Sequence, residues 1–179
     1  MRKISAAFIA VCIFVLALTG CSGNGGNITI EDPVTLQQVN TEGKYAARGY
    51  LESILTGDRE LFNACYPAGF VDDLNEVAGV DVFDQYMQTI KMSGTVMGTA
   101  SAGFRDYSIE NGYDTAQMRA RICSVTGKEY GAVEKIQIQK VRAFFKNDQE
   151  SYEADFFFVV FESQGSWYMF ESYRKESGF

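Results

Sequence analysis

The stretch Glu153–Phe161, EADFFFVVF, decides the fold of this chain. In a β-strand, alternate side chains point to opposite faces of the sheet. Both faces of this stretch are apolar, with Phe156, Phe158 and Val160 on one and Phe157, Val159 and Phe161 on the other. A strand of this kind needs a cover on each side. We therefore expect helices on one face and a second layer, a ligand or a partner subunit on the other.

Neighbouring segments predict the rest of an antiparallel sheet. Ile136–Phe145 (IQIQKVRAFF) and Trp167–Tyr173 (WYMFESY) have strand composition on either side of the central stretch. The polar connections KNDQES and ESQGS are typical of hairpin turns. Phe104–Glu110 predicts one further strand. The sheet is thus expected mainly from the C-terminal half of the chain.

The first half of the domain predicts helices. Thr41 is expected to cap the first of them, because the apolar residues that follow recur at helical spacing until Gly57, which can close a helix in the left-handed conformation. The other expected helices are Arg59–Cys65 after Asp58, Phe70–Val77, and a helix that begins at Val82 after Asp81. These features predict an α+β fold, with N-terminal helices packed on a curved antiparallel sheet.

The segment Asp114–Lys128 is ambiguous between helix and strand. Alternating apolar residues suit a strand, whereas Met118, Ile122 and Val125 suit one face of a helix that Asp114 and Gln117 would cap. The helix is the preferred interpretation.

The N-terminus predicts export and a lipid anchor. A basic start and a short apolar run over residues 1–20 have the parts of a signal peptide. The residues Leu18-Thr19-Gly20-Cys21 resemble the lipobox of bacterial lipoproteins. That resemblance implies a lipid on the Cys21 sulfur, cleavage before Cys21, and residence on the outer face of the cytoplasmic membrane. We expect no spanning helix, because the apolar run is shorter than the roughly 20 residues that a span needs.

Composition divides the chain into three parts. Residues 21–40 are expected to be the lipid anchor and a flexible tether, since SGNGGN at residues 22–27 cannot bury apolar surface. Residues 41–179 are expected to form a single domain. Residues 1–20 carry Arg2, Lys3 and no acidic residue, so the remaining chain holds 14 basic and 23 acidic residues, a net charge of −9. This balance argues against binding to nucleic acid, which needs clustered basic residues.

The absence of histidine restricts the chemistry more than any residue that is present. Catalysis by Ser-His-Asp or Cys-His arrangements is excluded, as are histidine-ligated metal sites. Asp72, Asp73, Asp81 and Asp84 lack the spacing of a calcium loop and are interpreted as helix caps and surface. Neither a metal nor another cofactor is expected.

Two cysteines, Cys65 and Cys123, remain after the signal peptide and the anchor are set aside. Outside the cytoplasm they could form a disulfide. Two buried thiols that act as small hydrophobic side chains are the slightly preferred alternative.

Two motifs carry a resemblance for the domain as a whole. AARGYLESILTGDRELFNACYP resembles the opening helix, Gly-Asp turn and second helix of the nuclear transport factor 2-like superfamily, and QGSWYMFES is similar to its closing strand. Small Gram-positive lipoproteins with such domains are the group that this sequence resembles. The resemblance implies a curved sheet wrapped around a long helix to form a cone, with an internal cavity and a dimer through the sheet.

Aromatic residues are the candidates for lining such a cavity. Tyr45 and Tyr50 on the first helix, with Trp167, Tyr168 and Phe170 on the last strand, could bind an apolar ligand, although such spacing favours a plain core. Lys140 and Arg142 would hold an anion if their face were the interior of the cone, and would be solvent-facing charges otherwise.

The sequence therefore predicts a lipid-anchored, non-enzymatic domain that binds a small ligand or another envelope protein. The alternatives are an isomerase or hydrolase that uses a buried Asp or Glu, and an assembly module that forms a homodimer through its sheet.

Overall fold

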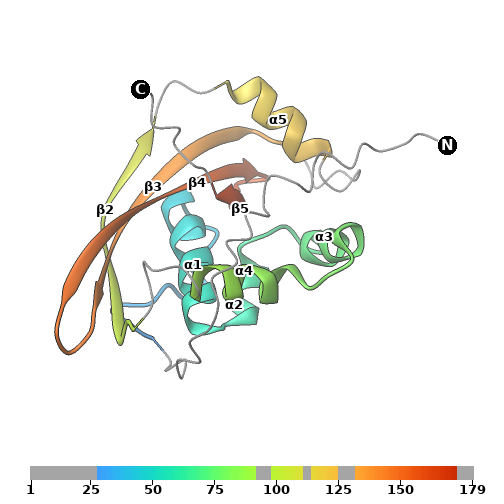
Figure 1. The fold of residues 1–179 in the computed structure, drawn as a ribbon. Helices are drawn as coiled ribbons and strands as arrows, with labels where there is room; N and C mark the ends of the chain where they lie inside the picture. Colours follow the sequence, from blue (N-terminus) through green and yellow to red (C-terminus); the bar gives the residue numbers. More distant parts are fainter. Residues whose placement is uncertain (1–27, 92–97, 111–113, 125–131, 173–179) are drawn as a thin grey trace, which may run out of the picture.

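The computed structural model describes residues 28–91, 98–110, 114–124 and 132–172. In Figure 1 a curved sheet forms a half-barrel around helix α1 (Gly43–Thr56). The shorter helices α2 (Arg59–Ala64) and α4 (Val82–Lys91) lie beside α1, and α3 (Phe70–Ala78) packs on α4. The fold is α+β, as the sequence predicts. Of the described helices, none combines the length and the hydropathy required to cross a bilayer.

The described sheet has five strands in the order β1-β2-β3-β4-β5. Their bounds are Thr29–Ile30, Ser101–Glu110, Lys135–Lys146, Ser151–Ser163 and Ser166–Ser172. The last four are antiparallel, as expected, but β1 pairs with β2 in parallel, so the sheet is mixed. The β4–β5 turn places Gln164 and Gly165 at positive φ (53° and 75°), the conformation that a tight two-residue hairpin requires.

Residues 28–40, which composition assigned to the tether, belong to the folded part. Thr29 and Ile30 pair with Ser101 and Ala102 of β2, and Val34 and Val39 are buried. The apolar side chains of this short segment are removed from water by packing on the domain. The folded domain therefore begins before residue 41.

The helix caps agree with the sequence in all but one case. Gly57 ends α1 at φ 82°, and the Asp58 carboxylate accepts a hydrogen bond from the Leu61 N–H at 3.0 Å. The predicted Thr41 cap is wrong, because Glu42 occupies the N-cap position and makes no side-chain cap. The Thr41 hydroxyl donates instead to the Gln38 carbonyl at 2.8 Å, within the preceding turn.

The central strand β4 buries aromatic residues on both faces. Phe158 lies on the face toward α1, where its ring is 5.6 Å from that of Tyr50. On the opposite face Val159 and Phe161 are almost completely buried, at 0% and 1% exposure. Both coverings that the sequence demands are therefore present within the described chain.

Helix α5 (Thr115–Ser124) supplies the second covering. Figure 1 shows it across β3 from α1. Its Arg121 donates to Glu171, which lies opposite Val159 in the β4–β5 register and so on the same outer face. Met118 and Ile122 are the buried side chains of this helix. The preferred helical interpretation of this segment is confirmed for Thr115–Ser124; residues 125–128 lie outside the described ranges.

Candidate functional site

Helix α1 carries a buried ion pair one turn apart. Arg48 Nε donates to Glu52 Oε1 at 2.5 Å, and the two side chains are only 8% and 2% exposed. The Arg48 guanidinium also lies over the Phe104 ring, 5.0 Å from its centroid. A charge pair this far from water is stable only when its remaining polar atoms also find partners.

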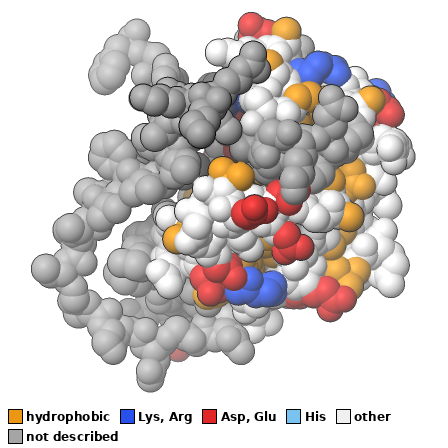
Figure 2. Space-filling view, turned by 90° about the vertical axis from the view of Figure 1, so that its right-hand side faces the viewer, with side chains coloured by type: hydrophobic (Ala, Val, Ile, Leu, Met, Phe, Trp, Pro, Cys, Tyr) orange, Lys and Arg blue, Asp and Glu red, His pale blue; other side chains and the backbone are white. Residues whose placement is uncertain are grey.

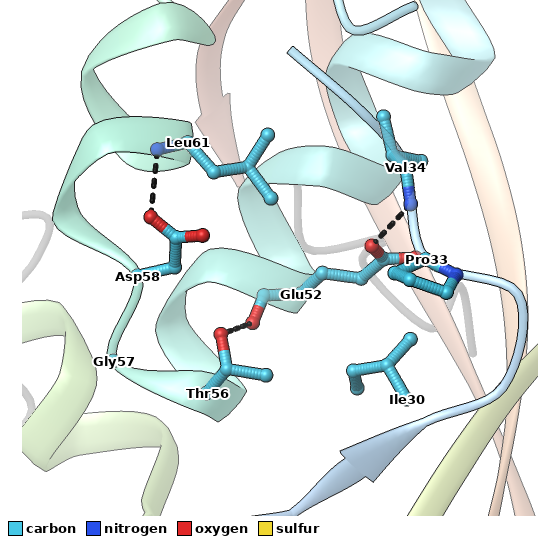
Figure 3. Close-up of a pocket in the computed structure, with 8 residues that line it drawn as sticks. All are labelled: Ile30, Pro33, Val34, Glu52, Thr56, Gly57, Asp58 and Leu61. Atoms are coloured by element: carbon cyan, nitrogen blue, oxygen red, sulfur yellow. Dashed lines mark hydrogen bonds between the residues drawn. The ribbon is translucent and has the colours of Figure 1, made fainter.

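Those partners come from the segment before α1 and from β2. Glu52 Oε2 accepts the Val34 N–H at 2.8 Å (Figure 3). The Arg48 guanidinium donates to the carbonyl groups of Glu31 and Asp32 and, at 3.0 Å, to the Tyr107 hydroxyl. The pair thus fixes residues 31–34 against α1 and the sheet.

A first hollow lies beside this pair at the end of α1, and we name it the α1 C-terminal pocket. Its volume is about 360 Å³, and it is lined by Ile30, Pro33, Val34, Glu52, Thr56, Gly57, Asp58 and Leu61 (Figure 3). Its polar side chains are already bonded: Thr56 donates to the Glu52 carbonyl, and Asp58 caps α2.

Glu52 has little freedom to act as a base in this pocket. Burial raises its pKa above the ordinary value, against the opposing effects of the Val34 N–H and Arg48. Both carboxylate oxygens nevertheless accept hydrogen bonds, so neither is free to take a proton from a ligand. The geometry indicates a structural role for this hollow.

A second hollow opens at the start of α1, against the inner face of the sheet, and we name it the α1 N-terminal pocket. Its volume is about 390 Å³, within the range of small-molecule sites. It is lined by Glu42, Gly43, Lys44, Tyr107, Ser108, Ile109, Gln137, Gln139 and Trp167.

Gly43 allows α1 to approach the sheet at this point. A Cβ atom at Gly43 would lie 2.9 Å from Gln137 Oε1, 3.0 Å from Val160 Cγ2 and 3.1 Å from Trp167 Cε3. A larger residue would therefore require the Gln137 side chain to move and Val160, Trp167 or α1 to shift by a few tenths of an ångström. The close contact brings the first turn of α1 and the two glutamines to one place.

Several polar groups here have unused hydrogen-bonding capacity. Gln139 is 3% exposed, and its amide nitrogen donates to the Ser108 and Lys140 carbonyl groups, but its Oε1 accepts from no described residue. The Gln137 amide has no hydrogen bond within the described ranges. The N–H groups of Gly43 and Lys44, at the first turn of α1, are likewise without a described acceptor. Gln139 is buried and Gln137 is half-buried, and neither Oε1 atom is fully shielded from the pocket, so both can accept a hydrogen bond from a ligand or water that enters it.

The charges of the α1 N-terminal pocket cancel. Lys44 Nζ lies 3.0 Å from Glu42 Oε2, at the rim, and this contact raises the pKa of Lys44. Burial raises the pKa of Tyr107, so its hydroxyl is neutral at physiological pH. The pocket therefore offers neutral hydrogen-bonding groups rather than a net charge.

Of the five aromatic candidates from the sequence, Trp167 lines this pocket. Tyr50 is core: it is 3% exposed and contacts Phe62, Tyr66, Tyr86 and Phe158. Tyr45 is packed on the same core, Tyr168 contacts Phe161 on the outer face, and Phe170 is buried. The five side chains do not form one cavity, because they are divided between the core and both faces of the sheet.

The sequence analysis missed the two glutamines. Gln137 and Gln139 pair with Val160 and Phe158 of β4, so they lie on the face toward α1. The sequence does contain a signal for them. In the strand IQIQKV the two glutamines alternate with isoleucines and so share a face with the apolar residues Val141 and Phe145.

Lys140 and Arg142 lie on the outer face, which answers the question left open for them. Asp155 pairs with both: Arg142 Nε is 2.7 Å and Lys140 Nζ 3.0 Å from its carboxylate. They are solvent-facing charges on the sheet, not ligands for an anion inside it.

This cluster predicts an acid-dependent loss of stability. Hydrogen bonding to Arg142 lowers the pKa of Asp155 from 3.8 to about 2. A lowered pKa stabilises the fold above pH 4, and the contribution is lost as the pH falls through about 2. Since the pair is partly exposed, we expect Asp155→Asn to cost about 1 kcal/mol at neutral pH and much less at pH 2. Urea unfolding at both pH values measures this; an equal cost at both would contradict it.

The clustered aspartates serve the helices. Asp81 accepts the Asp84 N–H at 3.1 Å, and Arg59 bridges Asp81 and Asp84 at 2.7 and 2.8 Å. Figure 2 shows acidic side chains on the face that carries the helices, with apolar side chains in small separate groups. Within the described ranges, no three His, Cys, Asp or Glu side chains are grouped to hold a metal ion.

Cys65 and Cys123 are free thiols in this structure, so the disulfide left open by the sequence is not formed. Cys65 is fully buried against α1 and donates to the Leu61 carbonyl at 3.2 Å, whereas Cys123 is exposed on α5. Burial raises the pKa of the Cys65 thiol well above its ordinary value, so this thiol is not a nucleophile.

No family model, no curated protein and no solved structure matches this chain.

Proposed function

We propose that this protein is a lipid-anchored, extracytoplasmic domain that binds a small polar ligand in the α1 N-terminal pocket. The observation that carries the proposal is the Gln139 amide, which is 3% exposed, lines the pocket and has an acceptor oxygen that no described residue uses. The Gln137 amide beside it, which has no hydrogen bond to a described residue, and the first turn of α1 add further hydrogen-bonding groups at the same place.

The curved sheet around α1 supports placing the domain among nuclear transport factor 2-like folds. In such a cone the ligand site is expected at the open end, between the helix and the inner face of the sheet. The α1 N-terminal pocket occupies a corresponding position, since its lining comes from α1, β2, β3 and β5. The family assignment is part of the proposal.

Binding is favoured over acid–base catalysis by the groups that line this pocket. Its one carboxylate, Glu42, is 56% exposed and paired with Lys44. Catalysis at a neutral pH needs a carboxylate that is buried and free to exchange a proton. The pocket offers hydrogen bonds for recognition instead.

The anchor is proposed from the lipobox-like residues 18–21, which lie outside the described residues. We expect Cys21→Ala to prevent lipid attachment and to leave the protein unprocessed or released, because the thiol is the only nucleophile at that position. Detergent partitioning and the intact mass of the exported protein measure both effects. Membrane retention with normal cleavage before residue 21 would contradict the anchor.

Binding is tested by native mass spectrometry of the full-length protein, extracted from membranes in a mild detergent. The proposal predicts a protomer that carries a discrete additional mass besides its lipid. A dimer without added mass would argue for the assembly role. That role is disfavoured on the outer face of the sheet by α5, which lies over part of it, and by the charges of Lys140, Arg142 and Asp155.

A further inference from the structure

The α1 N-terminal pocket contains both donors and acceptors that have no partner among the residues that the structure describes. The acceptors are the Oε1 atoms of Gln137 and Gln139. The donors are the Gln137 amide nitrogen and the N–H groups at the start of α1. The Tyr107 oxygen accepts from Arg48, which leaves its own proton available to a ligand. A hydroxyl group both donates and accepts hydrogen bonds, so it complements this mixture better than a group that only donates or only accepts.

The electrostatics of the pocket disfavour a charged ligand. Lys44 and Glu42 neutralise each other at the rim, and the groups deeper in the pocket are neutral amides and a phenol. A buried charge without a partner loses its hydration with no compensation. A ligand with several neutral polar groups avoids this cost.

The remaining lining is apolar and lies next to the amides. Trp167, which is 9% exposed, contributes an aromatic side chain, and Ile109, which is 51% exposed, contributes an aliphatic one. The face of an aromatic ring attracts C–H groups through its quadrupole. A ring with C–H groups on its faces and hydroxyl groups on its edge matches both kinds of surface.

We propose that the pocket binds an uncharged, hydroxyl-rich ring of the sugar class, with its edge hydroxyl groups on Gln137 and Gln139 and its C–H surface toward Trp167 and Ile109. This inference rests on the proposed function, because it names the ligand class of the same pocket.

The only tryptophan of the chain, Trp167, lines the pocket, so its fluorescence reports on this site. The full-length protein in detergent is titrated with N-acetylglucosamine and methyl glucoside as neutral sugars. Glucuronate and glucosamine serve as charged sugars of similar size, and indole as a flat apolar probe. A neutral sugar is expected to change the fluorescence to saturation, with no comparable change from the charged sugars or indole.

Gln137→Leu is the decisive variant, because Gln137 makes no hydrogen bond to the described part of the fold and its loss leaves the domain folded. It is expected to weaken the binding of the neutral sugar about tenfold or more, since hydroxyl groups then face an apolar side chain. The control is Val77→Leu, which changes a residue of α3 that is 51% exposed and outside the pocket. It is expected to bind the neutral sugar as the original protein does.

The outcomes separate the two proposals. Saturable binding of a neutral sugar that Gln137→Leu weakens supports the sugar inference. Preferential binding of a charged sugar or indole overturns the ligand class and leaves the binding function intact. If the neutral sugar binds Gln137→Leu as tightly as the original protein, Gln137 does not bind its hydroxyl groups and the sugar inference is overturned. If no probe binds while native mass spectra still show an added mass, the sugar inference fails alone; if the added mass is also absent, both proposals fail.

Discussion

Replacing Glu52 with alanine is expected to lower the free energy of unfolding by about 3–5 kcal/mol. The change removes the partner of the Arg48 guanidinium, which is buried with a side-chain exposure of 8%. It also removes the acceptor of the Val34 N–H, so the segment before α1 loses its attachment. Urea unfolding followed by circular dichroism measures the loss.

The control is the double variant Arg48→Met, Glu52→Leu. Two apolar side chains of similar size leave no buried charge, and replacing a buried ion pair in this way is often neutral or stabilising. The double variant is therefore expected to be more stable than Glu52→Ala. A cost below 1 kcal/mol for Glu52→Ala, of the size found for exposed pairs, would show that the pair is accessible to water.

Phe158→Ala is expected to lower the free energy of unfolding by about 3–5 kcal/mol. Phe158 is 2% exposed, and its ring packs against Tyr50 of α1 and stacks with Phe156 of its own strand. Removing it leaves a cavity between the sheet and α1 that neither can close.

Phe157→Ala is the matched comparison, since it makes the same change at the next residue of β4. Phe157 is half-buried on the outer face, so we expect a cost of about 1–2 kcal/mol. The ratio of the two losses of unfolding free energy measures how much more deeply the α1-facing side of the sheet is buried than the outer side. Equal costs would contradict the assignment of the α1-facing side as the main core.

Much of the fold could be predicted because the signals are local. The doubly apolar β4, the turn at Gln164 and Gly165, and the Gly57 and Asp58 caps each depend on residues close in the chain. The parallel pairing of β1 could not, because it joins Thr29 to Ser101 across a long separation and involves only two residues. The same reason explains why residues 28–40 were assigned to the tether.

The Thr41 cap failed for a different reason. Threonine is a good N-cap by propensity, but its hydroxyl can also bond a nearby carbonyl in a turn. Here the turn at Gln38 takes the hydroxyl, and α1 begins one residue later than expected. Local competition of this kind is not resolved by propensity alone.

The candidate site was only partly predictable. Trp167 was one of five aromatic candidates for a cavity, although core packing was favoured for all five, and it lines the α1 N-terminal pocket. Gly43, Tyr107 and the two glutamines come together through the register of three strands and the close approach of α1, which no single segment encodes. Tyr50 lies in the core, as its helical spacing favoured, where it contacts α2, α4 and β4.

The central claim is that the α1 N-terminal pocket is a binding site, and a blocked pocket tests it most directly. Ile109→Trp places a large side chain at the rim, where the original residue is 51% exposed and contributes little to the core. Val77→Trp makes the same enlargement on an equally exposed residue outside the pocket. Native mass spectra of both full-length variants and of the original protein, each exposed to envelope extract, are then compared. The account predicts a discrete added mass on the original protein and on Val77→Trp and its loss from Ile109→Trp; the same added mass on Ile109→Trp, or none on the original protein, would contradict it.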